Sequence, residues 1–407
     1  MKVYLNKNNA VFLSIFVVTL SESLFIINRG LGGFFEYIGY GILLLSVLAE
    51  FCKKTNHKEF RRKVIVFILL SLLMSCGFLI QDLTIRRKFV LSFTVFAICI
   101  VSTLSEKYLN SFRLIRRASY AILYAVLAAT ILGTVGGEKI IGDSEGLFGF
   151  TFAFCGGIKF KNYFAADMLA VFMGIYFSYR YGEKRKIDKY LLYLSSFLII
   201  ISNSRGGWIL FITFLIATRY SIIRKIKKGQ RKLLIIVAGV IGIGIFIYFF
   251  RNIAYKSGTY MYRVRGLANY IQYYQNDIFH LFFGNAETVY DKTNTYVMTV
   301  RSIVGWDGSL EMAVLNILIK SGILGVIAYI IIYLRIGKNI ITTNDWACKT
   351  GMVAVTVTML ISSLVEAYIQ SVHCIFAIYG YMVISGLYDL SKRNEYQRIN
   401  VDLIYNE

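Results

Sequence analysis

Several residue types that soluble proteins use freely are scarce or absent in this sequence. Its 407 residues include no proline and only 17% charged residues, whereas soluble domains carry about 5% proline and about 25% charged residues. Bends in helices must therefore come from the 33 glycines, because glycine tolerates backbone conformations that other residues resist. The low charge and the long apolar blocks exclude disordered, collagen-like and coiled-coil proteins.

Patterns for metal binding and disulfide formation are also missing. The chain has three histidines and six cysteines, and no two cysteines form a C-x-x-C pair. The cysteines lie mostly within apolar blocks or at their edges, at positions 52, 76, 99, 155, 348 and 374. We therefore expect no disulfide, no metal site and no cofactor.

The dominant feature that is present is apolar sequence. Hydrophobic residues make up 57% of the chain and the mean hydropathy is +0.60. The apolar blocks are long enough to cross a bilayer, which predicts an all-α polytopic membrane protein in which residues 1–407 form a single integral membrane domain. Twelve spans are expected, at about 10–28, 34–52, 64–80, 89–105, 119–136, 162–180, 190–203, 206–222, 233–250, 309–334, 350–368 and 374–390.

The net charge of +22 follows from the expected topology. Alternate connections between the spans carry 30 Lys and Arg residues on one side and 14 on the other. The positive-inside rule makes the richer side cytoplasmic, and an even number of spans places both termini on that side. We expect a multi-pass protein of the cell membrane, and the basic excess does not indicate nucleic-acid binding.

One outer connection is much longer than the others. Residues 251–308, between the ninth and tenth spans, form an extracytoplasmic loop that is too long for a simple connector. Apolar residues recur at helical spacing between about 260 and 282, which predicts an amphipathic helix on the membrane surface. The arginines and tyrosines of the loop suit an anionic, partly apolar, sugar-bearing ligand. The alternative is a disordered extracellular loop.

A short motif marks the expected outer turn between the seventh and eighth spans. Residues 202–208 read S-N-S-R-G-G-W, with Arg205 at the centre. A guanidinium held at the bilayer surface can bind a phosphate through two parallel hydrogen bonds, and glycines allow a ligand to approach the backbone. The alternative is an interfacial arginine that snorkels beside a tryptophan of the aromatic belt.

This motif belongs to an ordered set. Residues 161–166 read K-N-Y-F-A-A, residues 282–286 read F-F-G-N-A and residues 322–325 read G-I-L-G. In order, spacing and expected membrane side, the set resembles the O-antigen ligase/polymerase family of bacterial envelope glycosyltransferases, from about residue 155 to residue 335. The N-terminal third resembles that family only as apolar spans.

The resemblance implies transfer of a glycan from a polyprenyl pyrophosphate on the outer face of the membrane. Members of the family bind the diphosphate with two outer arginines. One of them matches Arg205. The other is best matched by Arg265, about nineteen residues before the F-G motif, and Arg263 is the alternative. A pair of arginines that binds lipid head groups would also explain Arg263 and Arg265.

The third functional residue of the family is commonly a histidine about eleven positions before the first glycine of G-x-x-G. This chain has Glu311 at that position, and a carboxylate could accept the proton of an attacking sugar hydroxyl. Asp307 and His280, the only histidine of the long loop, are the other candidate bases. The alternatives are helix capping by Asp307, an ion pair for Glu311 and an incidental loop histidine.

Ionisable residues inside or next to the apolar blocks are further functional candidates. They are Asp82, Lys320 and Glu366. Lys320 lies deep in the tenth expected span, where we expect it to pair with a carboxylate. Glu366 lies near the outer end of the eleventh span.

The function predicted from these features is polymerisation of polyprenyl-pyrophosphate-linked repeat units into capsular polysaccharide or exopolysaccharide. The reaction would invert the anomeric carbon and need no metal. Its partners would be the lipid-linked glycan donor and acceptor, membrane lipid, a flippase and a chain-length regulator. Two alternatives remain open: a flippase or transporter for the same lipid-linked sugars, and a related glycan ligase that differs only in its acceptor.

Overall fold

The computed structural model describes residues 7–143, 151–220, 244, 258–286 and 312–405, and these residues are mostly helical. The elements of the first half are α1 (Lys7–Leu20), α2 (Leu24–Asn28), α3 (Gly32–Lys54), α4 (His57–Ile80), α5 (Ile85–Leu104), η1 (Ser105–Lys107), α6 (Phe112–Val135), β1 (Ile141–Asp143), β2 (Phe152–Phe154), α7 (Lys161–Tyr181), α8 (Lys186–Ile201) and α9 (Arg205–Ala217). The elements of the second half are α11 (Gly258–Tyr274), α12 (Ile278–Phe283), α15 (Ala313–Thr342), α16 (Trp346–Val365), η5 (Tyr368–Gln370) and α17 (Ile375–Tyr405). The two strands pair in antiparallel fashion, with Gly142 opposite Ala153.

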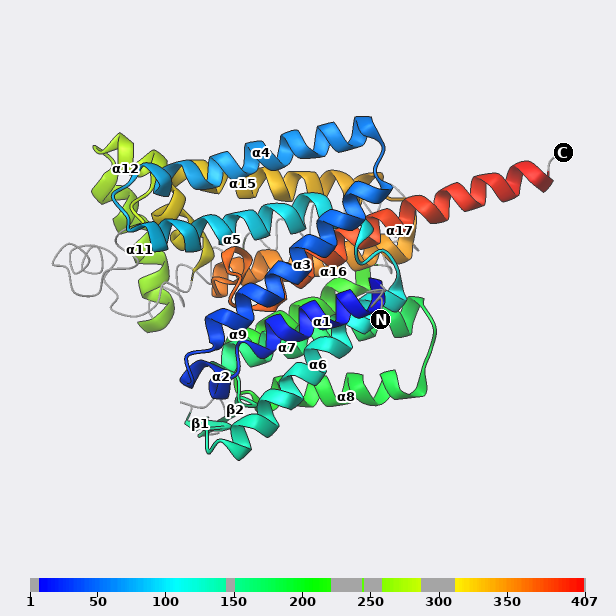
Figure 1. The fold of residues 1–407 in the computed structure, drawn as a ribbon, viewed down its shortest axis with the longest axis horizontal. Coiled ribbons are helices and arrows are strands. Elements are labelled where there is room, and N and C mark those ends of the chain that lie inside the picture. The colour runs from blue at the N-terminus through cyan, green and yellow to red at the C-terminus, as the bar shows by residue number, and fades with distance from the viewer. Residues whose placement is uncertain (1–6, 144–150, 221–243, 245–257, 287–311, 406–407) are drawn as a thin grey trace, which may run out of the picture.

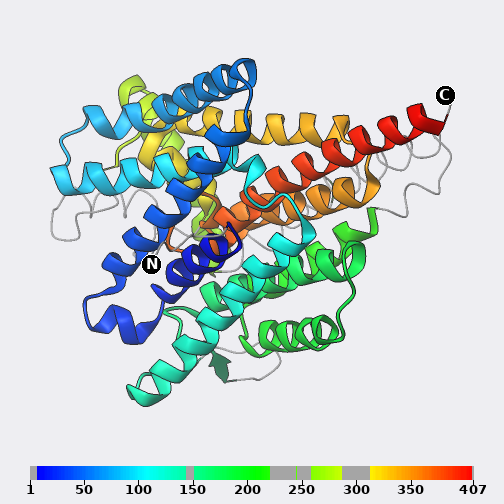
Figure 2. The same cartoon turned by 45° about the vertical axis from the view of Figure 1, so that its right-hand side comes forward.

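The long helices lie side by side in a bundle (Figure 1). One end, which we call the loop end, holds α2, the β1–β2 pair, α11 and α12. At the opposite end, which we call the terminal end, α1 begins and α17 finishes. α4 packs against α5 and α15, and the three helices lie together on one side of the bundle in both ribbon views (Figures 1 and 2). α6 packs against α1 and α7, and α16 packs against α9 and α17.

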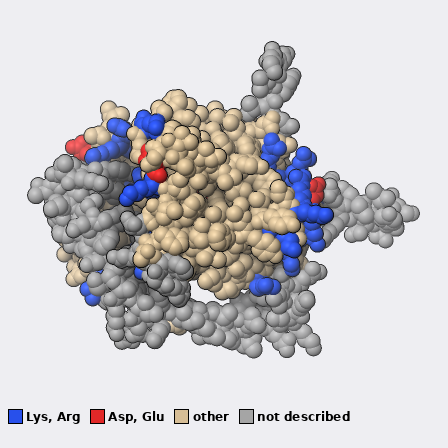
Figure 3. Space-filling model, turned by 90° about the horizontal axis from the view of Figure 1, so that it is seen from below, with Lys and Arg blue, Asp and Glu red and all other residues tan. Residues whose placement is uncertain are grey.

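The surface of the bundle suits a lipid environment. Within the described residues, six helices are long and apolar enough to cross a membrane: Gly32–Lys53, His57–Ile80, Ile85–Lys107, Phe112–Val135, Ala313–Thr342 and Trp346–Val365. On the face shown in Figure 3, Lys and Arg gather toward the two ends and leave a broad uncharged band between them. Large apolar side chains such as Leu45, Leu72 and Ile131 are 69%, 58% and 64% exposed. The prediction of a helical, membrane-embedded protein is confirmed at this level, and the number of twelve spans stays a prediction.

The first predicted span, at 10–28, is divided in the structure. α1 ends at Leu20, and α2 begins after a turn that is bonded to a segment distant in the sequence. Leu24 donates its backbone N–H to the carbonyl of Gly157 at 2.8 Å, and Ser23 forms an isolated β-bridge with Ile158. The break therefore depends on a contact with a distant segment, which the apolar pattern of residues 10–28 does not reveal.

The helix predicted at 260–282 is also two helices. α11 ends at Tyr274, and Asp277 begins α12 by accepting the backbone N–H of His280 at 3.1 Å. Such a side-chain cap satisfies a backbone donor that has no partner within the helix. The span predicted at 233–250 lies outside the described residues, apart from Gly244.

The F-G-N-A and G-I-L-G motifs pack directly on each other. Gly284 and Gly322 have φ of +78° and +63°, and α15 is kinked at Gly322. A Cβ on Gly284 would lie 2.6 Å from the carbonyl oxygen of Ile319, and one on Gly322 would overlap the carbonyl of Phe282. The backbone N–H of Asn285 donates to the Ile319 carbonyl at 2.6 Å. The glycines therefore allow the end of α12 to cross the kink of α15 in backbone contact.

Gln81, which follows α4, holds the other side of this crossing. Its Nε2 donates to the carbonyl of Gly284 at 2.6 Å, and its Oε1 accepts the backbone N–H of Ala286 at 2.7 Å. One side chain thus satisfies two backbone groups that are buried away from water.

Buried and partly buried ion pairs join the helices at the terminal end. They are Lys63–Glu106 at 2.7 Å, Lys107–Asp389 at 2.8 Å and Arg116–Asp188 at 3.2 Å. These pairs connect α4 to η1, η1 to α17 and α6 to α8. They account for several of the basic residues that the sequence places on the expected cytoplasmic side.

Candidate functional site

The 202–208 motif forms the turn between α8 and α9 at the loop end. Ser202 donates its hydroxyl to the carbonyl of Ile199 at 2.6 Å. Asn203 has φ of +49° and donates its Nδ2 to the carbonyl of Phe152 at 3.2 Å. Ser204 caps α9, since its Oγ accepts the backbone N–H of Gly207 at 3.1 Å. The three residues before Arg205 are therefore engaged in forming the turn.

The residues that follow Arg205 are fixed as well. Trp208 donates its indole N–H toward the carbonyls of Ile199 and Ile200, both at 3.2 Å, and so covers the end of α8. A Cβ on Gly207 would lie 2.6 Å from the Cβ of Ala165. Glycine at this position lets α9 approach α7 closely.

Arg205 differs from its neighbours because its side chain is not used to build the turn. It is the first residue of α9 and is exposed. Within the described part of the chain, no hydrogen bond or ion pair involves its guanidinium. The start of a helix also presents backbone N–H groups and the positive end of the helix dipole. This arrangement is suited to binding an anion at the loop end.

Asn162 of the K-N-Y-F-A-A motif connects this turn to an acidic residue. Its Oδ1 accepts the hydroxyl of Ser204 at 2.8 Å, and its Nδ2 donates to Oε1 of Glu366 at 2.9 Å. Its backbone carbonyl accepts the hydroxyl of Tyr368 at 2.8 Å. Asn162 therefore joins the start of α7, the start of α9 and the end of α16.

Glu366 is the acidic residue at the centre of this group. It follows the last residue of α16 and is 7% exposed. Its carboxylate lies beside the α9 turn, because a Cβ on Gly206 would be 3.1 Å from Oε1. Burial raises the pKa of Glu366 to about 7, and the positive charge of Arg263 opposes this increase. A carboxyl group with this pKa can gain and lose a proton near neutral pH.

The two loop arginines occupy different environments on α11. Arg263 is partly buried and is the arginine whose charge acts on Glu366. Arg265 is exposed. α11 itself is held to α15 by Tyr270 and Tyr274, which belong to a buried cluster with Leu315 and other residues at the start of α15. The structure thus places Arg263 near the Arg205 turn through their shared neighbour Glu366.

The candidate bases fall into two groups. His280 forms a 2.6 Å interaction between its Nδ1 and Oδ2 of Asp277, and this hydrogen bond holds the pKa of Asp277 below its usual value. The histidine thus helps to start α12. Asp307 and Glu311 lie outside the described residues.

Lys320 does not have the expected partner among the described residues. No ion pair of the described chain includes its ammonium group, and it lines a small cavity of about 60 Å³. Residues of α4, α5 and α15 and residues 370–373 line this cavity. A carboxylate partner for Lys320 is therefore not found in the described part of the bundle.

No protein-family model and no curated protein sequence matches this chain. The assignment of a site therefore depends on the motifs and on the contacts described above.

Sequence reasoning identified Arg205 but not the group that surrounds it. Glu366 was recognised only as an ionisable residue near the end of a span, and Asn162 only as a motif residue. The contact between them joins positions 204 residues apart. A carboxylate at the outer end of an otherwise apolar helix was the available signal for Glu366.

Proposed function

We propose that this protein polymerises polyprenyl-pyrophosphate-linked oligosaccharide repeat units into capsular polysaccharide or exopolysaccharide. In this proposal the chain crosses the cell membrane twelve times, both termini are cytoplasmic, and the loop end faces outward. The growing glycan on its lipid diphosphate is the donor, and a lipid-linked repeat unit is the acceptor.

One observation carries the proposal. Arg205 projects from a turn whose other polar residues are used to build it, and the next residue of that turn, Gly206, packs against the buried carboxyl group of Glu366, whose pKa is raised. Two of the motifs that resemble the O-antigen ligase/polymerase family contribute to this group: Asn162 comes from one, and Ser204 and Arg205 from the other. A cation for a diphosphate and a base for an alcohol are the two functions that such a transfer requires.

The proposed reaction is a single displacement. The acceptor hydroxyl attacks the anomeric carbon of the donor sugar, the new glycosidic bond forms, and the bond between that carbon and the diphosphate oxygen breaks. Arg205 and one arginine of α11 stabilise the negative charge of the departing lipid diphosphate. A carboxylate accepts the hydroxyl proton, and attack from the opposite face inverts the anomeric carbon.

Glu366 is the base that we favour. It packs against Gly206, the residue after Arg205, and its pKa is about 7, so a large fraction is ionised at neutral pH and can accept a proton. Glu311, Asp307 and His280 remain alternative bases. Among these three, His280 is the one in the described part of the chain, and its ring is directed toward Asp277.

The test of the proposal is polymer synthesis by purified protein supplied with lipid-linked repeat units. We expect Arg205→Ala to reduce the rate of chain extension by about 100-fold or more, because removing one charge-assisted contact to a developing anion costs several kcal/mol. Arg205→Lys should recover only part of the rate, since an ammonium group cannot make the two parallel hydrogen bonds of a guanidinium. Lys139→Ala, at an exposed cation of another loop-end connection, is the matched control. Full synthesis by Arg205→Ala would end the proposal.

The second arginine can be assigned with the same assay. Arg263→Ala should impair synthesis more than Arg265→Ala, because the charge of Arg263 acts on Glu366 and Arg265 is exposed. A larger effect of Arg265→Ala would favour the assignment made from the spacing to the F-G motif. Equal wild-type activity of both variants would show that α11 does not bind the diphosphate.

A flippase for the same lipid-linked sugars is the second candidate. Lys320 in its cavity within the bundle favours it, because transporters place charged groups inside the membrane domain. Purified protein that forms long chains in detergent without any gradient would support the polymerase. Movement of labelled lipid-linked repeat units across liposomes, without chain extension, would support the flippase.

A further inference from the structure

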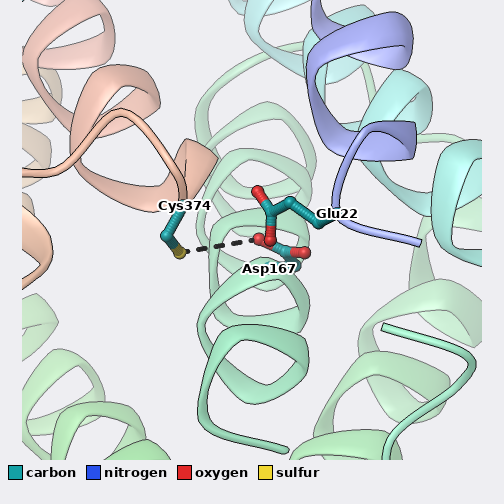
Figure 4. Close-up of side chains that lie close together, drawn as sticks. All are labelled: Glu22, Asp167 and Cys374. Atoms are coloured by element: carbon teal, nitrogen blue, oxygen red, sulfur yellow. Dashed lines mark hydrogen bonds between the residues drawn. The ribbon is translucent and has the colours of Figure 1, made fainter. Parts of the chain in front are cut away.

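Three side chains from distant parts of the chain meet inside the bundle (Figure 4). Glu22 comes from the turn between α1 and α2, Asp167 from α7, and Cys374 from the residue before α17. One ligand atom from each lies within 4.8 Å of those of the other two. The closest contact given by a hydrogen bond is from Sγ of Cys374 to Oδ1 of Asp167, at 3.9 Å.

The cluster is buried and its oxygen atoms are poorly satisfied. Asp167 and Cys374 are fully buried and Glu22 is 6% exposed. Among the described residues, both carboxylate oxygens of Glu22 and Oδ2 of Asp167 lack a hydrogen-bond partner at normal distance and geometry. The backbone N–H of Ile375 is the polar group that lies near the Glu22 carboxylate. Figure 4 shows that the Glu22 side chain points toward Asp167 and Cys374.

No cation of the described chain compensates this negative charge. None of the ion pairs in the described residues includes Glu22 or Asp167. Two carboxylates that are buried together without a counter-charge are strongly unfavourable. A bound cation would remove that penalty and satisfy the open oxygen atoms at once.

We propose that Glu22, Asp167 and Cys374 form a binding site for a divalent metal ion of the zinc type. Carboxylate oxygen and thiolate sulfur are both common zinc ligands, whereas calcium and magnesium select oxygen alone. Binding would release the thiol proton of Cys374, and any proton held by Glu22 or Asp167, because thiolate and carboxylate are the coordinating forms. The ligand atoms would have to move closer by about 1 Å to reach usual zinc–oxygen and zinc–sulfur distances.

Such an ion would tie together three segments at the loop end of the bundle. It would hold the α1–α2 turn, α7 and the start of α17 in one position. The proposal does not depend on the proposed polymerase reaction, since the metal contacts residues other than Arg205 and Glu366. Its test therefore uses metal binding and stability, which the outcome of the polymer assay does not affect.

The direct test is the metal content of the purified full-length protein after equilibration with Zn²⁺ and removal of free ion. We expect about one zinc ion per chain. Cys374→Ser should lower zinc affinity at least 10-fold, and Cys76→Ser, at a partly buried thiol of α4, should leave it unchanged. With Co²⁺ in place of zinc, the wild type should show thiolate-to-cobalt charge-transfer absorption and Cys374→Ser should not.

A second measurement covers the case in which a variant fails to fold. A strong chelator should lower the thermal unfolding temperature of the unmodified protein, and added Zn²⁺ should restore it, because an ion that binds only the folded state stabilises that state. Glu22→Gln should weaken this response. Absence of bound metal together with no response to chelator would overturn the proposal, as would equal zinc content in the wild type and Cys374→Ser.

Discussion

Arg205 and Glu366 belong to the same turn region and have opposite surroundings. The arginine is exposed, whereas the glutamate is buried and accepts a hydrogen bond from Asn162. This contrast gives each residue a different chemical capacity. The exposed guanidinium can bind an incoming anion, and the buried carboxyl group can exchange a proton at neutral pH.

The raised pKa of Glu366 predicts the pH dependence of the proposed reaction. A base must be deprotonated, so the rate of polymer synthesis should rise with pH and level off above about 7. Glu366→Gln should lower the rate by about 100-fold or more, and the remaining rate should no longer rise with pH below about 7. His280→Ala is the discriminating variant. If His280→Ala abolishes the increase in rate with pH and Glu366→Gln does not, then His280 is the base.

The raised pKa of Glu366 also makes the stability of the folded state depend on pH, in a direction that can be measured. The folded state raises the pKa of this acid from its ordinary 4.5 to about 7, so the folded protein holds a proton that the unfolded chain has lost. The stability of the folded state should therefore be highest below pH 4.5, as far as this group is concerned, and should fall as the pH rises toward 7. The thermal unfolding temperature of Glu366→Gln should therefore change less between pH 4.5 and pH 7 than that of the wild type.

Contacts between single residues were the least predictable part of the site. The sequence pattern identified Arg205 and its turn because the motif is local. It did not pair Asn162 with Glu366, since nothing in one sequence indicates which distant side chains will meet. It also gave no sign that Glu22, Asp167 and Cys374 would lie together.

At the level of elements, the crossing of α12 and α15 depends on two glycines. Gly322 has φ of +63°, and a Cβ there would overlap the Phe282 carbonyl. We expect Gly322→Ala to destabilise the folded protein by roughly 2–4 kcal/mol, because it adds backbone strain and forces the two segments apart. The measurement is thermal unfolding in detergent.

A matched control lies further along the same helix. Gly337 of α15 faces open space, and a Cβ on this residue would have no other side chain or segment within 4 Å. Gly337→Ala should leave the stability unchanged or raise it by about 1 kcal/mol, because alanine favours the helix more than glycine does. Equal effects of the two substitutions would show that the crossing does not need Gly322.

Most long helices could be predicted from apolar blocks. The features that could not be predicted have physical causes. The predicted span at 34–52 corresponds to α3 at Gly32–Lys54, and the one at 350–368 corresponds to α16 at Trp346–Val365. The break at Leu20 and the short β1–β2 pair were not predicted. Both depend on pairing between separate segments, which hydropathy along the chain does not record.

At the level of the whole molecule, the proposed orientation can be tested by chemical labelling. Lys139 lies in the connection after α6, at the loop end, and Lys184 lies between α7 and α8, at the terminal end; both are exposed. A membrane-impermeant thiol reagent should label Lys139→Cys in intact cells. It should label Lys184→Cys only after the membrane is opened. The reverse pattern would invert the topology and place Arg205 on the cytoplasmic side.

The structure of the 202–208 turn bears on what the same sequence motif indicates in other proteins. Six of the seven residues are explained by the tight reversal between two helices: they bond to backbone carbonyls, cap a helix, cover a helix end or permit close approach. A chain that kept those six and carried a different residue in place of Arg205 would be expected to bend in the same way while lacking the guanidinium. The motif as a whole thus indicates the conformation of the turn, and only the arginine indicates the capacity to bind an anion.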